Sequence, residues 1–207
     1  MDQNPSLHMR GYLPHLELAG TTQYVTFRLD DALPMEVYSR WRDELCHLSD
    51  RDRMRELYRR CERFLDAGHG SCIFKNPAAA RIVQESLFEY SRTHYDLHYW
   101  VVMSNHAHIM ITPFGGVSLS DAMQRIKGAS SKRIHEKLGG RGRLWQPESF
   151  DRLVRNDDMR DRVAHYIHWN PVKAKLCKQP EDWPYSSANR VAVDLYKQAK
   201  ACEPNAG

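Results

Sequence analysis

The stretch HYWVVMSNHAHIMITP, residues 98–113, is an apolar run with two histidines one residue apart. Successive side chains of a strand point to opposite faces, so His106 and His108 point one way and Ala107 points the other. With a rise of roughly 3.3 Å per residue, the two imidazoles lie about 7 Å apart on one face, within reach of a single metal ion. Because Ser104 and Asn105 are the whole link between the two apolar segments, we expect a hairpin.

A histidine in a strand has a plainer interpretation as well. It can be a half-buried residue with an ordinary hydrogen-bond partner, and for one histidine alone that interpretation is favoured. A same-face pair in so apolar a run makes metal binding an equal competitor, because neutral imidazole is a common ligand of borderline metals. Residues 98–113 alone leave both interpretations open.

Regular patterns continue upstream of the hairpin. Residues 21–31 alternate apolar and polar side chains, which predicts a strand with one covered face. Residues 34–67 predict one or two helices, with a break at LSDRDR, that end at the Gly68-His69-Gly70 signal. Residues 72–74 are a candidate short strand, and residues 76–95 predict a helix capped by Asn76.

Downstream, residues 118–140 predict a helix with an apolar stripe and a basic side. Residues 150–155 predict a last strand, and a further helix begins at Asp157 and should end near Asn170, because Pro171 disfavours helical geometry in the residue before it. The resulting order predicts an α+β, ferredoxin-like (RRM-like) antiparallel sheet with helices on one face and an extra C-terminal helix.

The chain of 207 residues is long enough for one sizeable core. We expect an N-terminal arm over residues 1–20, one domain over residues 21–190 and a tail over residues 191–207. No apolar run has the length of a membrane span and the N-terminus lacks a secretory profile, which predicts a cytoplasmic protein. Five cysteines without a C-x-x-C pair are read as reduced thiols.

The net charge of +4 is unevenly distributed. Residues 121–175 contain thirteen Lys or Arg and seven Asp or Glu, an excess of 13 − 7 = +6. Such an excess is often a solvated face, but it also fits a polyanion such as nucleic acid. Six side chains are candidate DNA contacts. Four are basic residues of the predicted 118–140 helix, Arg125, Lys127, Lys132 and Arg133, and the other two are Arg28 and Trp145. Trp145 can stack on a base or lie in the core, and Arg28 is predicted on the histidine face.

The stretch HYIHWNP, residues 165–171, carries a second pattern. Tyr166 and Asn170 are four residues apart and therefore share one face of a helix. Taken alone, Tyr166 is a core aromatic and Asn170 a C-terminal cap. Beside the His106 and His108 pair, the Asn170 oxygen is a suitable hard donor for a divalent ion, with water and phosphate oxygens as further ligands.

His106-Ala107-His108 followed by Tyr166-x-x-x-Asn170-Pro171 resembles the single-tyrosine HUH nucleases. More narrowly, the chain is similar to the REP-associated tyrosine transposases, bacterial relatives of the smallest insertion-sequence transposases. The segments that carry this resemblance include YVTFRL, MSNHAHIMITP, LWQPESFDRLVR, YIHWNPVKAKL and EDWPYSSA. An asparagine stands at position 170 where the insertion-sequence enzymes have glutamine, a change that the REP-associated group tolerates.

The resemblance implies the HUH single-tyrosine transposase fold, with the tyrosine on the extra C-terminal helix. It implies that Tyr166 attacks a phosphodiester and forms a 5′-phosphotyrosine, and that His106, His108 and Asn170 hold Mg²⁺ or Mn²⁺. The implied partner is single-stranded DNA folded into hairpins of the REP/BIME type, in the bacterial cytoplasm. The expected form is a monomer, and a dimer, as in the insertion-sequence relatives, is the alternative. Two alternatives remain: a catalytically idle regulator bound to repeat DNA, and a metal-dependent phosphodiesterase that uses water.

Overall fold

The computed structural model describes residues 6–10, 13–17 and 20–201. Its centre is a four-stranded antiparallel sheet in the order β4-β5-β3-β6. The strands are β3 (Gln23–Arg28), β4 (Tyr95–Val102), β5 (His106–Pro113) and β6 (Phe150–Leu153). The first and third of them occupy the middle of the sheet, as in a ferredoxin-like sandwich. The predicted fold class and the predicted hairpin between β4 and β5 are confirmed.

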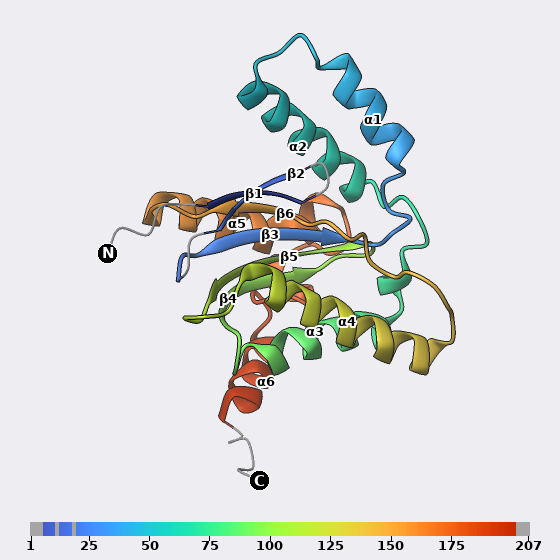
Figure 1. Ribbon diagram of the computed structural model, residues 1–207. Coiled ribbons are helices and arrows are strands. Elements are labelled where there is room, and N and C mark those ends of the chain that lie inside the picture. The colour runs from blue at the N-terminus through green and yellow to red at the C-terminus, as the bar shows by residue number, and fades with distance from the viewer. Residues whose placement is uncertain (1–5, 11–12, 18–19, 202–207) are drawn as a thin grey trace.

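Two crossover helices cover one face of this sheet, α3 (Pro77–Tyr90) and α4 (Leu119–Leu138) (Figure 1). Both begin at capping side chains that accept a backbone N–H, Asn76 for α3 and Ser118 for α4. They bury the side of the sheet that carries Val25 and Ile109 in the largest apolar cluster among the described residues. Helix α6 (Arg190–Ala201) packs beside α3.

The opposite face is covered as well. Helix α5 (Asp157–Lys173) packs on β4 and β5, and its Ile167 lies in a cluster with Tyr24 and Met110. Helices α1 (Met35–Glu44) and α2 (Asp50–Asp66) form a pair on the other side of the sheet from α3 and α4 (Figure 1). All six residues of β3 are therefore buried, and the prediction that this strand has only one covered face is wrong.

Three boundaries differ from those expected. Residues 73–75 form a short 3₁₀ helix, η1 (Ile73–Lys75), rather than a strand, because Cys72 is left-handed (φ 48°) and turns the chain. Helix α3 ends at Tyr90, a turn earlier than predicted. Helix α5 does not end near Asn170 but continues through Pro171 to Lys173. Proline removes one N–H from the helix, and the buried packing of Asn170 and Pro171 compensates for that loss.

Regular structure also occurs near both ends of the described chain. The segment expected as an arm contains an antiparallel hairpin of β1 (Ser6–Arg10) and β2 (Leu13–Glu17), and β2 adjoins β6. A second short 3₁₀ helix, η2 (Pro180–Asp182), precedes α6. None of the helices in the described ranges is long and apolar enough to cross a membrane.

The turn that follows α2 is fixed to the sheet. The Ser71 N–H donates to Asp31 Oδ2 over 2.7 Å, and a Cβ on Gly70 (φ 83°) would lie 2.7 Å from the Asp31 carbonyl oxygen, so only glycine fits there. On the other side, Asn105 Nδ2 donates to the His69 carbonyl over 2.8 Å. The C-terminal end of α2 is thereby held next to the strand that carries the histidines.

Candidate active site

His106 and His108 share a face of β5 and lie opposite Arg28 and Thr26 of β3. Their side chains are 1% and 0% exposed, and their two Nε2 atoms are 3.0 Å apart. The two histidines thus share one face of β5, as predicted, and their Nε2 atoms lie next to side chains of α5 and α2. Arg28 is on the histidine face as predicted, but it is buried, with its guanidinium over the Phe150 ring.

Hydrogen bonds to the other ring nitrogens fix how the imidazoles are oriented. Asn105 directs its Nδ2 at the His69 carbonyl, so its Oδ1 is the acceptor for His106 Nδ1–H over 2.7 Å. His106 Nε2 consequently presents a lone pair toward His108. His108 Nδ1 lies 2.8 Å from the Tyr24 hydroxyl and 2.9 Å from Thr26 Oγ1, either of which can accept its proton. Such partners hold imidazoles in a metal-binding tautomer.

Helix α5 brings Tyr166 and Asn170 to the histidine pair. The Tyr166 ring meets the His108 ring edge to face at a centroid distance of 5.4 Å. Asn170 is fully buried inside the helix rather than at its end, and its Nδ2 lies 3.2 Å from His108 Nε2. The structure therefore brings together all four residues of the two motifs.

Three further side chains, which the sequence analysis did not select, complete the cluster. The Tyr166 hydroxyl donates to Glu62 Oε2 of α2, and that oxygen is 3.8 Å from His108 Nε2. One turn later on α2, Asp66 Oδ1 is 3.9 Å from His106 Nε2. Lys173 of α5 pairs with Asp66 over 2.7 Å and places its ammonium 5.4 Å from the centre of the Tyr166 ring.

Of Glu62, Asp66 and Lys173, only Lys173 could have been placed near the site from a pattern in the sequence. Lys173 follows Tyr166 by seven residues and Asn170 by three, so it shares their helix face. Glu62 and Asp66 share a face of α2, but that helix precedes the histidines by some forty residues, and only the tertiary fold brings it to them. Glu62 is buried beside the apolar stripe of α2, where a carboxylate is rarely found without a partner.

Burial dominates the proton equilibria of the cluster. It lowers the pKa of His106 to about 3, with the positive charges of Lys173 and Arg28 acting in the same direction, so that His106 is a neutral imidazole. Burial is also the main reason why the pKa of His108 is lowered. Burial raises the pKa of Glu62 to about 7. It also raises the pKa of Tyr166, and the charge of Glu62 adds to that rise.

The donor set fits a divalent cation. Neutral imidazoles face each other through Nε2, and Asn170 Oδ1 is buried without a hydrogen-bond partner among the described residues. Rotating that amide by half a turn would exchange its nitrogen for its oxygen at His108. In the tautomers set by these hydrogen bonds neither Nε2 carries a proton, so His106, His108 and Asn170 would offer lone pairs to a cation that they held together.

The predicted basic contacts of α4 lie elsewhere. Helix α4 covers the opposite face of the sheet, so the sheet separates its basic side from the histidine pair. Arg125 and Lys132 are exposed there and Arg133, which pairs with Glu89, is half-buried; all three line a polar hollow of about 820 Å³ that faces away from the pair.

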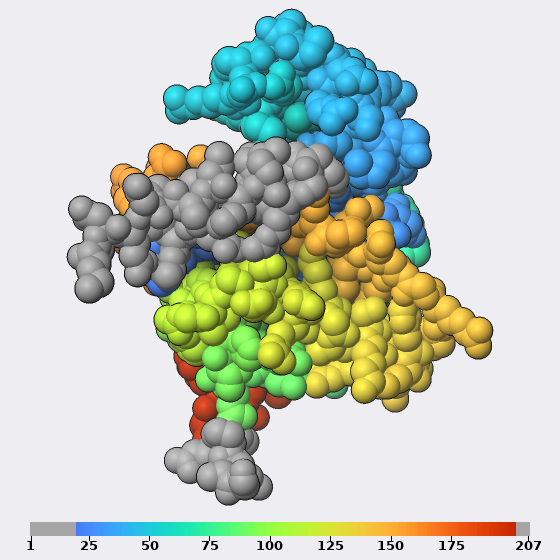
Figure 2. All heavy atoms as spheres, in the orientation of Figure 1, coloured from blue at the N-terminus to red at the C-terminus, as the bar shows by residue number. Residues whose placement is uncertain are grey.

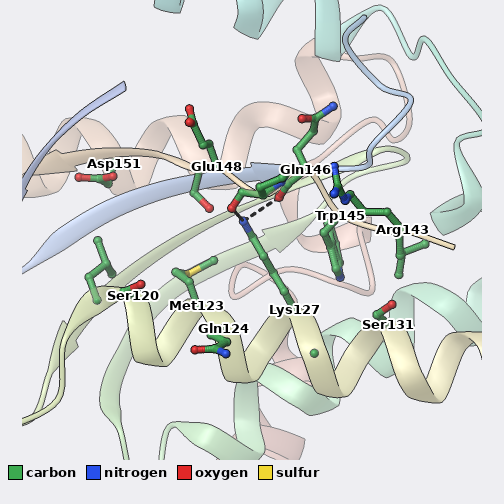
Figure 3. A pocket seen from close by; sticks show the side chains of 15 residues that line it. Ser120, Met123, Gln124, Lys127, Ser131, Arg143, Trp145, Gln146, Glu148 and Asp151 are labelled. Carbon is green, nitrogen blue, oxygen red and sulfur yellow. Dashed lines mark hydrogen bonds between the residues drawn. The ribbon is translucent and has the colours of Figure 1, made fainter. Parts of the chain in front are cut away.

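Trp145, in the loop before β6, and Lys127, on α4, both make contacts that join this loop to α4 (Figure 3). Trp145 is 4% exposed, packs against Phe27 and donates to Ser130 Oγ. Of the two alternatives that the sequence left for Trp145, it therefore lies in the core. Lys127 reaches across a pocket of about 490 Å³ and donates to the carbonyl oxygens of Gln146 and Pro147 at 3.0 and 3.1 Å. It thus joins α4 to the loop before β6.

Replacing Lys127 should change how stability depends on pH. Burial lowers the pKa of Lys127 to about 7, whereas an unfolded lysine titrates near about 10.4. Between these values the unfolded chain binds more protons, so this residue makes the free energy of unfolding rise with pH. Lys127→Met should reduce that rise, measured as urea midpoints between about pH 7 and 10. The exposed Lys132→Met is the control; equal slopes in all three proteins would contradict the assignment.

The comparisons with known proteins select the same part of the chain. The model of the family described as "Transposase IS200 like" matches residues 73–170, which include both histidines, Tyr166 and Asn170. A REP-associated tyrosine transposase of Escherichia coli K12 is 36% identical over 104 residues, which cover 49% of this chain and 60% of that protein. A protein of Haemophilus influenzae assigned to the same group is 36% identical over 56 residues, or 27% of this chain and 32% of that one.

The chain thus spans less than two thirds of the length of either curated relative. Among solved structures, that of a REP-associated tyrosine transposase bound to a REP hairpin has a TM-score of 0.55, covers 95% of this chain and 93% of its own, and is 18% identical. At that identity the likeness concerns the fold. The resemblance of this chain to the REP-associated tyrosine transposases, carried by a segment that matches the IS200-like transposase family, is confirmed.

Proposed function

We propose that the protein is a metal-dependent endonuclease and strand transferase that acts on single-stranded DNA hairpins of the repetitive extragenic palindrome type. The observation that carries this proposal is the packing of the Tyr166 ring against His108, beside Asn170. The Tyr166 hydroxyl bonds to Glu62 Oε2, which is itself 3.8 Å from His108 Nε2. The name of the E. coli relative and the REP hairpin in the related structure support the choice of substrate.

In the proposed reaction, the Tyr166 oxygen attacks the scissile phosphorus. The new bond joins the phenolic oxygen to the 5′-phosphate, and the bond from phosphorus to the 3′ oxygen breaks, which leaves a free 3′-hydroxyl. A divalent ion held by His106, His108 and Asn170 would neutralise charge on the phosphate. Lys173, beside the Tyr166 ring, is placed to attract the same phosphate. Reversal by a 3′-hydroxyl would rejoin strands.

The two alternative functions differ in their products. A repeat-bound regulator would bind hairpins without cutting them, and a phosphodiesterase would cut them with water and leave no bond to the protein. The Tyr166 hydroxyl in the cluster favours the transferase, because neither alternative requires a phenol at that point. We propose a monomer in the bacterial cytoplasm as the working form.

A denaturing gel distinguishes the three functions. The protein is incubated with a pool of single-stranded DNA hairpins that have randomised flanks and are labelled at the 3′ end, which stays on the fragment bound to the protein, in the presence of Mg²⁺ or Mn²⁺. A labelled band that migrates with the protein after denaturation supports the transferase. Cleavage without that band would establish the phosphodiesterase, and binding without cleavage would establish the regulator.

We also propose that the exposed basic side of α4 contacts hairpin phosphates. Neutralising Arg125 and Lys132 together as glutamines should lower the log-log salt slope of DNA affinity by about 1.4, at roughly 0.7 per single-strand phosphate. Fluorescence anisotropy at several salt concentrations measures this slope. Lys175→Gln and Lys178→Gln, two exposed lysines beyond α5, form the matched control. An unchanged slope in the α4 variant would place the DNA elsewhere.

A further inference from the structure

Glu62 is a buried carboxylate that the proposed mechanism has not used. It belongs to α2, which lies between β3 and residue 73 and therefore outside the segment that matches the IS200-like family. In Figure 2, α1 and α2 stand out as a lobe above the rest of the molecule. That lobe nevertheless reaches the reacting atom, because the Tyr166 hydroxyl donates its hydrogen to Glu62 Oε2.

We propose that Glu62 is a catalytic residue, the base that takes the proton from the Tyr166 hydroxyl as that oxygen attacks phosphorus. This inference rests on the proposed function. It adds a residue from the helical pair α1–α2 to proposed catalytic and metal-binding residues that otherwise come from β5 and α5. The pair α1–α2 then has a chemical role in addition to its packing.

The surroundings of Glu62 suit a proton acceptor. Its other oxygen, Oε1, lies within 3.4 Å of Thr26 Oγ1, which holds the carboxylate in place. Thr26 also contacts His108 Nδ1, so the acceptor and the histidine pair have a common support on β3. The side chain is 7% exposed, which excludes most of the water that would otherwise compete for the phenolic proton.

The position of α2 is also well defined. The turn after α2 is held by Asp31 on one side and by Asn105 on the other. Lys173 of α5 forms an ion pair with Asp66, one turn beyond Glu62 on the same helix. These three attachments maintain the distance between the carboxylate on α2 and the phenol on α5, which proton transfer requires.

The proton balance of the step is complete. The Tyr166 O–H bond breaks and its proton passes to the Glu62 carboxylate, while the phenolic oxygen forms its bond to phosphorus. The 3′ oxygen leaves with the electron pair of the broken P–O bond and takes up a proton, which the now neutral Glu62 carboxyl group or water supplies. In the reverse step, the Glu62 carboxylate takes the proton of the attacking 3′-hydroxyl and returns one to Tyr166.

Glu62→Gln tests the assignment, because glutamine has nearly the same shape and still accepts a hydrogen bond but is not a base. The adduct on the hairpin pool with Mn²⁺ should form about 10²- to 10⁴-fold more slowly in single-turnover experiments. Hairpin affinity and melting temperature should stay close to those of the parent. Glu62→Asp, which retains a carboxylate, should have an intermediate rate.

Glu56→Gln is the matched control. Glu56 is on the same helix, is bonded to Arg59 and Arg60, and should give the parental rate. A second measurement separates a base from a support. Replacing Tyr166 with 3,5-difluorotyrosine makes the phenol more acidic, so it should restore much of the rate that Glu62→Gln loses.

Each contrary outcome overturns the assignment. A parental rate in Glu62→Gln would show that no base is needed there, and a faster rate would show that Glu62 restrains Tyr166. A slow rate that the fluorinated phenol does not restore would reduce Glu62 to a positioning residue. If the parent protein forms no adduct with the whole pool, the proposed function fails and this inference fails with it.

Discussion

Replacing Tyr166 with phenylalanine should abolish the protein–DNA adduct and lower the rate of strand cleavage by roughly four to six orders of magnitude. Phenylalanine keeps the ring and its edge contact with His108, but it lacks the oxygen that we propose attacks phosphorus. The buried Glu62 carboxyl group loses a donor, so we expect a cost of about 1 to 3 kcal/mol in the free energy of unfolding. Hairpin binding should survive. Single-turnover cleavage and a denaturing gel measure the two losses.

Tyr185→Phe is the control for this experiment. Tyr185 is half-buried against the core on the α3 side of the sheet, and its backbone oxygen pairs with Val102. Its hydroxyl is remote from the histidine pair, so the adduct should form as in the parent. An adduct in Tyr166→Phe would mean that another residue is the nucleophile. Cleavage without an adduct would mean that water attacks, and the phosphodiesterase would then be the better account.

Removing the metal, or either histidine, should have the second largest effect. With a chelator, or in His106→Ala or His108→Ala, cleavage should fall about 10³-fold or more, since several kcal/mol of charge stabilisation is lost. Both histidines are buried, so these variants should also melt at a lower temperature. Calorimetry adds a measurement that does not depend on activity: Mn²⁺ should raise the melting temperature of the parent but not of the variants.

His98→Ala is the matched substitution. His98 lies on β4, is half-buried and bonds to Thr112 Oγ1 rather than to the cluster. This variant should keep both the stabilisation by Mn²⁺ and the cleavage activity. Stabilisation by Mn²⁺ that persists without His106 and His108 would rule out the metal site.

Local patterns were sufficient for much of the fold. The alternation over residues 21–31, the short link at Ser104 and Asn105 and the cap Asn76 each act over a few residues. The prediction failed where distant packing decides the conformation. Pro171 stays helical because α5 is held against the sheet, and Cys72 turns the chain because the segment after α2 must dock on Asp31.

The site follows the same division. His106 and His108 are neighbours on a strand, and Tyr166 and Asn170 are neighbours on a helix, so the motifs predicted each pair separately. Glu62 reaches the phenol only because α2 folds back over the sheet, and no local pattern contains that information. The burial of Trp145 likewise depends on Phe27 and Ser130, which come from other elements.

The side chain of Asn105 connects two parts of the molecule that otherwise look independent. Its amide nitrogen binds the turn after α2, and its oxygen accepts the proton of His106 Nδ1. If α2 moved away, the amide could rotate and present its nitrogen to His106, which would then carry its proton on Nε2, the atom that faces His108. The docked position of α2 and the form of His106 that can bind a cation therefore occur together. The proposed base on α2 is in place only when His106 Nε2 has a free lone pair.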